Sequence, residues 1–176
     1  ATVSDDKSCL VWNVERGKIN ARLEGWHEEP VYGVKFLPSN PSVLATVAFD
    51  KRCIIWDLRS NEAVQEIFGH SDDIIGLDFS PCGSLLATGS DDQTCRVWDV
   101  RGTYSPVLNL QHDDAVKRVA WSPCGSMLVV ASADCNAYVW RVETSGSTVR
   151  KMLKGHTDFV FDVAWLPTDP GGGRGQ

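Results

Sequence analysis

The stretch of sequence that decides the fold is residues 69–99, GHSDDIIGLDFSPCGSLLATGSDDQTCRVWD. It opens on a Gly-His pair, reaches an aromatic at Phe79, turns at Ser-Pro-Cys-Gly and ends on the run CRVW followed by Asp99. Proline and glycine in the middle preset the backbone of a hairpin. Runs rich in Val, Ile and Cys favour strands. The stretch therefore predicts short antiparallel strands joined by tight turns.

The same pattern recurs along the chain. A tryptophan ends a short β-rich run four times, at spacings of 44, 42 and 42 residues: Trp12, Trp56, Trp98 and Trp140. A histidine recurs at spacings of 43, 42 and 44 residues: His27, His70, His112 and His156. An aromatic follows each histidine by nine residues: Phe36, Phe79, Trp121 and Trp165. Several marks that repeat in phase indicate a tandem-repeat fold.

A period near 42 residues with Gly-His and Trp-Asp marks resembles the WD40 family. The resemblance implies an all-β propeller, whose blades are sheets of four antiparallel strands, a to d from the channel outward. Four blade equivalents are expected. The chain begins in strand b before Ser4, runs through strand d at 18–23, makes three full rounds and ends in a sixteenth strand, a strand a at 159–166. We expect the propeller to span 1–170, with repeats centred on the four tryptophans and a partial last repeat from 155, and 171–176 to be a Gly-rich tail or linker.

Three arrangements of the blades are open. The chain closes on itself as a four-bladed ring, two copies build one larger ring, or the chain is an arc of a longer propeller. Self-association through open blades belongs to the second arrangement, because unpaired strand edges bind further strands. The N-terminal sequence Ala-Thr-Val-Ser-Asp-Asp, which has no initiator Met, favours the arc.

Serine and aspartate fall eight and six residues before the marker tryptophans. With the preceding histidine they form two complete sets: His70, Ser90, Asp92 and Trp98, and His112, Ser132, Asp134 and Trp140. These residue types invite a hydrolase interpretation. A nucleophile is needed only once, however, and copies at the structural period favour a hydrogen-bonded network that maintains the blade. In it, Asp accepts from His and Ser bonds both His and the indole. Ser4, Asp6 and Trp12 lack an upstream histidine, which His156 would supply only on closure within or between chains.

Aromatic residues that the repeat does not require are candidates for partner contacts. By the resemblance they lie on the top face around the channel mouth, together with charged residues of the same loops. The expected partner-binding set is Trp26, Tyr32, Phe49, Asp73, Asp91, Lys117, Phe159 and Phe161. The pair Tyr32 and Phe49 is expected to neighbour Phe159 and Phe161 in a four-bladed ring, but not in a longer arc.

Charge narrows the class of partner. The formal net charge is −6, which argues against direct nucleic-acid binding because that needs clustered Lys and Arg. Acidic residues gather in the loops of the expected top face, among them Glu29, Asp73 and Asp91. The leading hypothesis is a non-catalytic scaffold that binds other proteins within an assembly. The alternative is a reader of basic peptides or tails on an acidic, aromatic-lined top face.

Most of the six cysteines fit the repeat as small core residues or turn residues. Cys9, Cys53 and Cys95 each precede a marker tryptophan by three residues, and Cys82 and Cys124 both stand in Ser-Pro-Cys-Gly. Free thiols in such numbers are typical of a reducing compartment, so an intracellular protein, cytoplasmic or nuclear, is expected. No apolar run suggests a membrane span. No metal, cofactor or catalytic residue is expected.

Overall fold

The computed structural model describes residues 1–102, 104–143 and 148–166, and the side chains of 148–150 are not part of that description. Within these ranges every regular element is a β-strand, and the fifteen strands form four antiparallel sheets. The predicted all-β architecture with four blade equivalents is confirmed. The expected Gly-rich tail at 171–176 lies outside the described residues.

The sheets follow one another along the chain. Sheet 1 contains β1 (Thr2–Val3), β2 (Cys9–Asn13) and β3 (Lys18–Leu23). Sheet 2 contains β4 (Val31–Leu37), β5 (Asn40–Ala48), β6 (Cys53–Asp57) and β7 (Glu62–Ile67). Sheet 3 contains β8 (Ile74–Phe79), β9 (Leu85–Ser90), β10 (Thr94–Asp99) and β11 (Ser105–Gln111). Sheet 4 contains β12 (Val116–Trp121), β13 (Met127–Ser132), β14 (Ala137–Val142) and β15 (Thr148–Leu153).

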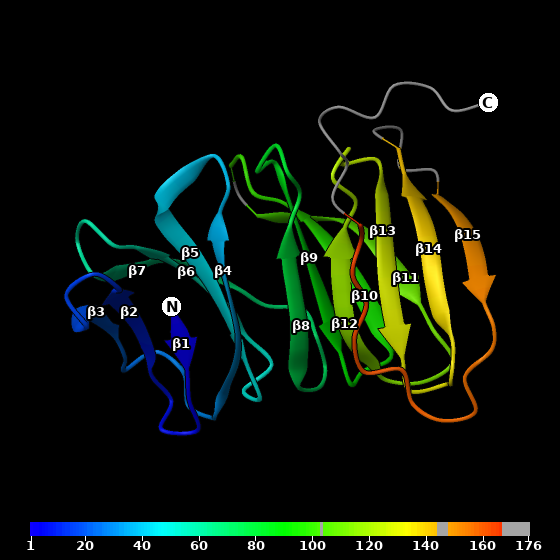
Figure 1. The fold of residues 1–176 in the computed structure, drawn as a ribbon, viewed down its shortest axis with the longest axis horizontal. Helices are drawn as coiled ribbons and strands as arrows, with labels where there is room; N and C mark the ends of the chain where they lie inside the picture. Colours follow the sequence, from blue (N-terminus) through cyan, green and yellow to red (C-terminus); the bar gives the residue numbers. More distant parts are fainter. Residues whose placement is uncertain (103, 144–147, 167–176) are drawn as a thin grey trace.

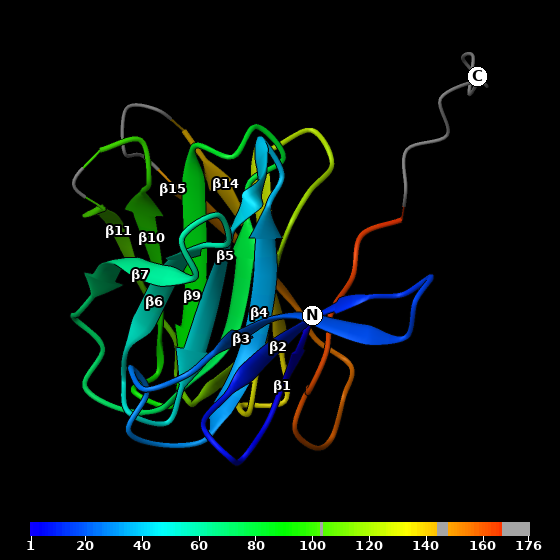
Figure 2. The same cartoon turned by 90° about the vertical axis from the view of Figure 1, so that its left-hand side faces the viewer.

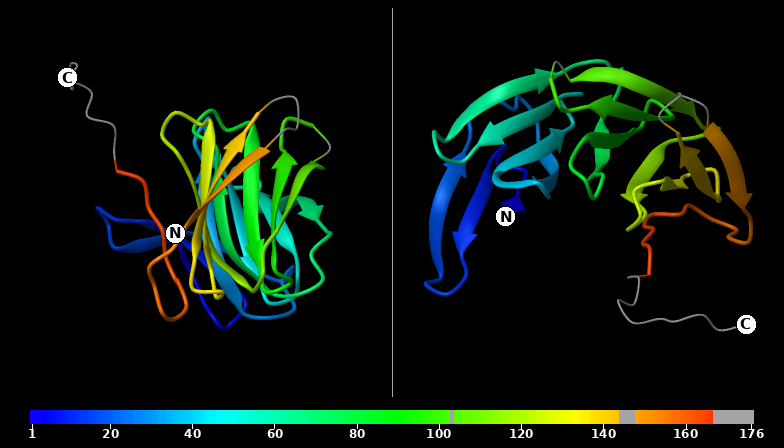
Figure 3. Two further views of the ribbon diagram at one scale, coloured as in Figure 1. Left: turned by 90° about the vertical axis from the view of Figure 1, so that its right-hand side faces the viewer. Right: turned by 90° about the horizontal axis from the view of Figure 1, so that it is seen from above.

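The four sheets stand side by side as a curved row (Figure 1). Seen from above, the row is an open arc with sheet 1 at one end and sheet 4 at the other (Figure 3). The strands β4, β8 and β12 line the concave side and contact one another in sequence order. Figure 2 shows sheet 1 end-on, with β1, β2 and β3 at the near end of the row. The single chain forms an open arc and not a closed four-bladed ring, and this shape is compatible with both of the other arrangements.

The prediction of a last strand at 159–166 is wrong. Residues 154–166 form no strand, so the described chain has fifteen strands and not sixteen. The segment nevertheless runs beside sheet 4, where the Val160 amide donates to the Ser132 carbonyl over 3.1 Å and the Trp165 indole donates to the Ala120 carbonyl over 2.9 Å. Its sequence has the pattern of an inner strand, but among the described residues no strand forms a ladder with it.

The core is divided among the three junctions between neighbouring sheets. Trp56, Trp98 and Trp140 are each buried in the junction with the preceding sheet. Small residues at the start of the tryptophan-bearing strands, such as Cys53 and Cys95, are fully buried. All six cysteines are free thiols, and those of the Ser-Pro-Cys-Gly turns are exposed. The core and turn roles predicted for Cys53, Cys95 and the two turn cysteines are confirmed.

Glycines let the inner strands approach closely. A Cβ atom on Gly76 in β8 would lie 3.1 Å from the Arg118 Cα and 3.2 Å from the Val119 nitrogen, both backbone atoms of β12. Asp78 then ties three inner strands together. Its carboxylate lies 3.1 Å from the Lys35 ammonium of β4 and accepts from the Trp121 amide of β12 over 2.8 Å. These contacts set the spacing of the sheets on the concave side.

Replacing Gly76 by alanine is expected to destabilise the protein. The added methyl group meets backbone that cannot rotate away, so sheets 3 and 4 must separate slightly, at a cost of about 1–3 kcal/mol in the free energy of unfolding. Urea denaturation measures this change. The matched control is Gly102→Ala, because nothing lies within 4 Å of that position, and it should stay within about 0.5 kcal/mol of the parent. Equal stability of the two variants would contradict this packing account.

Candidate interaction surface and its supporting network

A hollow of about 400 Å³ lies on the concave side of the arc, at the ends of the inner strands. Its walls come from sheets 2, 3 and 4 and from the segment after β15, and they consist of Tyr32, Phe49, Ile75, Asp91, Lys117, Arg118, Phe161 and Asp162. Five of the eight residues expected to bind a partner are therefore brought together in one place. Concave sites with aromatic walls are where proteins commonly receive ligands and partner side chains.

The aromatic walls are ordered in pairs. Tyr32 and Phe49 stack with ring centroids 5.4 Å apart, and Phe159 meets Phe161 edge-to-face at 6.1 Å. Tyr32, Phe159 and Phe161 are exposed by 56%, 51% and 68%. Rings held in pairs but open to solvent lose little conformational freedom when a partner covers them.

The expectation that these two aromatic pairs meet only in a closed four-bladed ring is wrong. Tyr32, Phe49 and Phe161 line the same hollow although the row of sheets is open. The reason is the curvature of the arc: the inner strands converge on the concave side, so residues from sheet 2 and from the segment beyond sheet 4 face one space.

The charged groups of the hollow are already paired. The Lys117 ammonium donates to the Asp91 carboxylate over 2.8 Å, and this pair joins sheets 3 and 4. The Arg118 guanidinium lies 3.3 Å from the carboxylate of Asp162. Each positive group thus has a negative neighbour inside the hollow, and the aromatic and aliphatic surface is what it offers to a partner.

The lining residues missed by the sequence analysis could have been found from the repeat itself. Four lining side chains occupy one position, five residues after a repeat histidine: Tyr32, Ile75, Lys117 and Phe161. The sequence pattern did not single out Ile75, because its side chain is neither aromatic nor charged. Arg118 and Asp162 stand one residue further on, and their inclusion depends on the mutual approach of the inner strands.

The other expected partner residues lie outside the walls of the hollow. Trp26 is 42% exposed in the loop between β3 and β4, and Phe159 reaches the hollow only through its contact with Phe161. Asp73 stands in the loop before β8. Partial burial raises the pKa of the Asp73 carboxyl, and the nearby carboxylates of Asp72 and Asp91 raise it further. Asp73 therefore marks a local concentration of negative charge beside the hollow.

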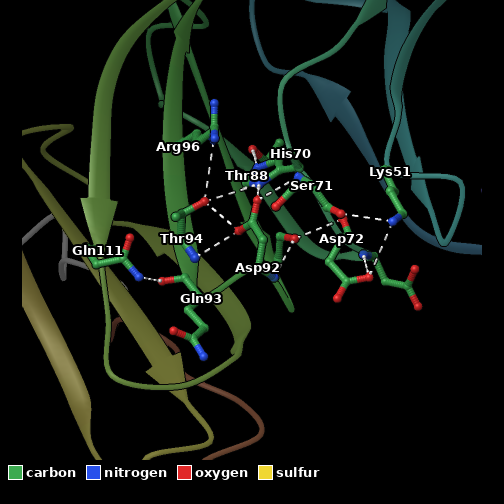
Figure 4. A network of polar contacts seen from close by, with 12 residues as sticks. Lys51, His70, Ser71, Asp72, Thr88, Asp92, Gln93, Thr94, Arg96 and Gln111 are labelled. Carbon is green, nitrogen blue, oxygen red and sulfur yellow. Dashed lines mark hydrogen bonds and ion pairs between the residues drawn. The ribbon is translucent and has the colours of Figure 1, made fainter.

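A buried hydrogen-bond network supports this face from within sheet 3 (Figure 4). His70 Nδ1 lies 2.8 Å from the Asp92 carboxylate, and His70 Nε2 lies 2.7 Å from the Thr88 hydroxyl. The Trp98 indole donates to the same hydroxyl over 2.9 Å. The His70 and Asp92 side chains are only 1% and 4% exposed. The network thus fixes the loop before β8 onto the turn after β9.

The prediction that Ser90 links the histidine to the tryptophan is wrong, because the Thr88 hydroxyl makes both of these hydrogen bonds. Thr88 is two residues before Ser90 on the same strand, and its hydroxyl can accept from the indole while it bonds the imidazole. The Ser90 hydroxyl instead donates to the Asp72 carbonyl over 3.0 Å and accepts from the Asp92 amide over 3.1 Å. Since side chains alternate along a strand, positions 88 and 90 share one face, and the pattern alone did not separate them.

The network varies between sheets. Sheet 2 has the same network as sheet 3. His27 Nδ1 lies 2.8 Å from the Asp50 carboxylate, and His27 Nε2 lies 2.8 Å from the Thr46 hydroxyl. The Trp56 indole donates to that same hydroxyl.

In sheet 4, Val130 stands at the threonine position, and the Trp140 indole donates to His112 Nε2 over 3.2 Å. The Asp134 carboxylate there accepts from the Tyr138 hydroxyl. The Ser132 hydroxyl donates to the Asp114 carbonyl over 3.2 Å, as Ser90 does in sheet 3.

The turns that carry these aspartates also connect neighbouring sheets. Lys7 and Lys51, one residue after Asp6 and Asp50, have φ angles of 70° and 67°. The Lys51 ammonium donates to the Ser71 carbonyl over 2.9 Å, and the Lys7 ammonium donates to the Glu28 carbonyl at the equivalent place of the preceding sheet. The left-handed turn thus aims a lysine at the loop of the next sheet and helps to hold the top face together.

Thr88→Val removes the shared hydroxyl and leaves the His70 imidazole and the Trp98 indole without a common partner. The free energy of unfolding should fall by about 1–3 kcal/mol, the cost of leaving buried polar groups unsatisfied. Denaturant titration measures this loss. Thr157→Val, at an exposed position, is the matched control and should change little. Unaltered stability of the Thr88 variant would remove threonine from the network.

Acid should weaken the same network. Burial alone would raise the pKa of the Asp92 carboxyl, but hydrogen bonds from His70 and Thr94 outweigh it and lower that pKa below its usual value. A carboxyl whose pKa is lower in the folded state adds stability above its unfolded pKa, and this is lost as pH falls through the folded value. Stability should therefore decline below about pH 3.9. Asp92→Asn should flatten that decline, and an equally steep decline in the variant would contradict this assignment.

Comparison with known proteins gives two findings. The family described as "WD domain, G-beta repeat" matches residues 17–57, 61–99 and 104–141. A similar protein is the "Guanine nucleotide-binding protein subunit beta" of Schizosaccharomyces pombe, which is 43% identical over 42 residues. That match covers 24% of this chain and only 13% of the relative, so the similarity is confined to a small part of both proteins.

Two other kinds of feature are absent from the part of the chain that the structure describes. The described residues contain no group of three or more His, Cys, Asp or Glu side chains placed to hold a metal ion. They also contain no helix that is long and apolar enough to cross a membrane.

Proposed function

Because the chain belongs to the WD40-repeat family, we propose that it is a non-catalytic scaffold that holds other proteins in an assembly through the hollow on its concave side. WD40 repeats generally mediate protein–protein interactions. The observation that carries the proposal to this site is the aromatic wall of Tyr32, Phe49 and Phe161, in which Tyr32 and Phe161 are exposed and Phe49 is half-buried. Exposed, preordered rings are typical anchors of a protein interface.

Burial of the repeated histidine networks supports a non-catalytic role. Their hydroxyl and imidazole groups are buried and form hydrogen bonds that stabilise the blade. They are therefore not accessible to a substrate, as a catalytic nucleophile has to be. Six free thiols, three of them buried, fit a reducing and hence intracellular setting.

The pairing of charges inside the hollow favours an apolar or aromatic anchor from the partner. A basic side chain would have to displace Lys117 from Asp91 or Arg118 from Asp162 before it found a free carboxylate. An inserted Leu, Phe or Met would instead pack on the rings without breaking either ion pair. The charge pairing therefore favours a scaffold that binds apolar anchors over a reader of basic peptides.

The reader of basic peptides remains a second candidate because of one observation, the negative charge at Asp73. Burial and the nearby carboxylates of Asp72 and Asp91 raise the pKa of Asp73, and the three groups form an acidic border next to the aromatic wall, in which Asp91 is paired with Lys117 and Asp72 lies 3.8 Å from the Lys51 ammonium. A peptide that combines an apolar anchor with a lysine or arginine would satisfy both features. Such binding is electrostatic in part and would weaken as salt is added.

Tyr32→Ala and Phe161→Ala are expected to lose bound partners while the fold is kept. Proteins captured on the immobilised chain should bind at least about tenfold more weakly to either variant, since an anchor residue contributes about 1.4 kcal/mol or more. The measurement is quantitative affinity capture followed by titration of the captured proteins. Phe36→Ala is the matched control, because Phe36 is 39% exposed on the same strand β4 but outside the hollow.

The outcome separates the two candidates. Capture that the Phe36 variant and the two hollow variants retain equally would overturn the proposed site. A synthetic lysine-rich peptide with interspersed leucines serves as the probe for the second candidate. Binding of that peptide that disappears in Asp73→Asn and in high salt would favour the reader.

A further inference from the structure

A second hollow, of about 360 Å³, lies at the junction between sheets 3 and 4. Leu85 of β9 and Val142 of β14 line it and pack against the core cluster of that junction. Val107 of the outer strand β11 and the thiol of Cys82 complete its walls on the side of sheet 3. We call this hollow the junction groove. It lies at the turn after β8, so it is at the opposite end of the sheets from the concave hollow.

The equivalent place between sheets 2 and 3 is filled by the chain's own Tyr104. Two valines there occupy the repeat positions of Leu85 and Val142, each 42 residues earlier: Val43 and Val100. Both pack, together with Tyr104, against the core cluster of sheets 2 and 3. Tyr104 is half-buried, and burial raises the pKa of its phenol. A groove between two sheets of this row therefore accepts an aromatic ring.

The backbone of Tyr104 indicates that packing of the ring is favourable. Its φ angle is 51°, in the left-handed region that a bulky residue rarely adopts. Asn61, which directly precedes β7 as Tyr104 directly precedes β11, has a φ angle of 57°. Asparagine tolerates this conformation more easily than tyrosine does. The contacts of the ring in the groove therefore offset the strain in the backbone.

The junction of sheets 3 and 4 has the groove but no aromatic residue at the corresponding place in the sequence. The segment between β14 and β15, residues 143–147, reads Glu-Thr-Ser-Gly-Ser. At the rim of the groove, the Arg101 guanidinium donates to the Asp99 carboxylate over 3.0 Å. Because this charge is paired, the surface that the groove offers to a ligand is the apolar one of Leu85, Val107 and Val142.

We propose that the junction groove binds an aromatic side chain of a partner protein. The ring packs against Leu85 and Val142, as Tyr104 packs beside Val43 and Val100 at the neighbouring junction. The inference goes beyond the proposed function, because it assigns a second surface at the other end of the sheets. The two surfaces share no residue, so failure of either proposal leaves the other in place.

The thiol of Cys82 reports directly on occupancy of the groove. Cys124, in the same turn of sheet 4, is also exposed but is not among the residues that line the groove. Hydrogen bonds from the hydroxyl groups of neighbouring serines lower the pKa of each of the two thiols to about 7. Both should therefore react with iodoacetamide at neutral pH, and Cys124 serves as an internal control.

The test measures alkylation of the two thiols in the full chain by mass spectrometry, with N-acetyltyrosinamide as the probe for an aromatic side chain. The probe should bind with a dissociation constant of roughly 1 mM, as expected for a small ligand. At about ten times that concentration, alkylation of Cys82 should slow about tenfold, whereas that of Cys124 should not change. N-acetylleucinamide at the same concentration should protect Cys82 clearly less. Absence of protection at Cys82, or equal protection of both thiols, would overturn the proposal.

Val107→Glu should abolish the protection of Cys82, because a ring in the groove would have to desolvate the new carboxylate. Val64→Glu is the matched control. Val64 and Val107 are each the residue skipped at the bulge of an outer strand, and they are exposed by 53% and 42%, so both variants should fold. Val64 lies on β7 of sheet 2, away from the junction groove, and its variant should keep the protection. Protection that persists in the Val107 variant would contradict the proposed site.

Tyr104→Ala tests whether such a groove holds a ring. The melting temperature should fall by about 2–6 °C, and N-acetyltyrosinamide should recover part of this loss. Tyr104→Phe keeps the ring and should stay close to the parent protein. An unchanged melting temperature in the alanine variant would overturn the proposal, because the ring would then gain nothing from the groove.

Discussion

Burial of three of the marker tryptophans, each against the sheet before it, is the contact on which the rest of the structure depends. Trp56, Trp98 and Trp140 each close a junction between two sheets, and the indole is oriented there by a hydrogen bond inside its own sheet. The apolar surface of the ring drives the packing, and the polar edge fixes its direction. A sheet in this row cannot bury its own hydrophobic face alone, so neighbouring sheets stabilise one another. The concave hollow exists because these junctions set the curvature of the row.

Much of this could be predicted from the phase of the repeat. The spacing of the marker tryptophans gave the number of sheets, and the strand β3 has the expected bounds of 18–23. The top-face position of Tyr32, Phe49 and Phe161 also followed from phase, since a residue at a fixed distance from a repeat histidine falls at the same end of each inner strand. Local sequence is sufficient to predict these positions because each repeat packs against its neighbours in the same way.

The rest depends on contacts between repeats, which phase does not contain. Whether residues 159–166 pair as a strand is decided by the presence of a neighbour and not by their own pattern, which resembles that of β8. Within sheet 3, the choice of Thr88 over Ser90 as the shared hydroxyl depends on strand register, since Trp98 pairs with Leu86, which is two residues from Thr88 and four from Ser90. The ion pairs Lys117–Asp91 and Arg118–Asp162 join different repeats. Because of them, the hollow has paired charges and an aromatic wall, whereas the sequence alone predicted an acidic face.

The row of sheets also has a consequence for how the protein opens. Sheets 2 and 3 have a packed neighbour on both sides, whereas sheets 1 and 4 have one sheet on one side only. In a linear array each unit is held by its own stability and by its nearest neighbours, so fluctuations start at the ends and move inward. Backbone amides of β5 and β9, which belong to the two sheets packed on both sides, should accordingly be among the last to exchange with solvent. Sheets 2 and 3 are therefore the stable frame on which the inner strands β4 and β8 present the concave hollow.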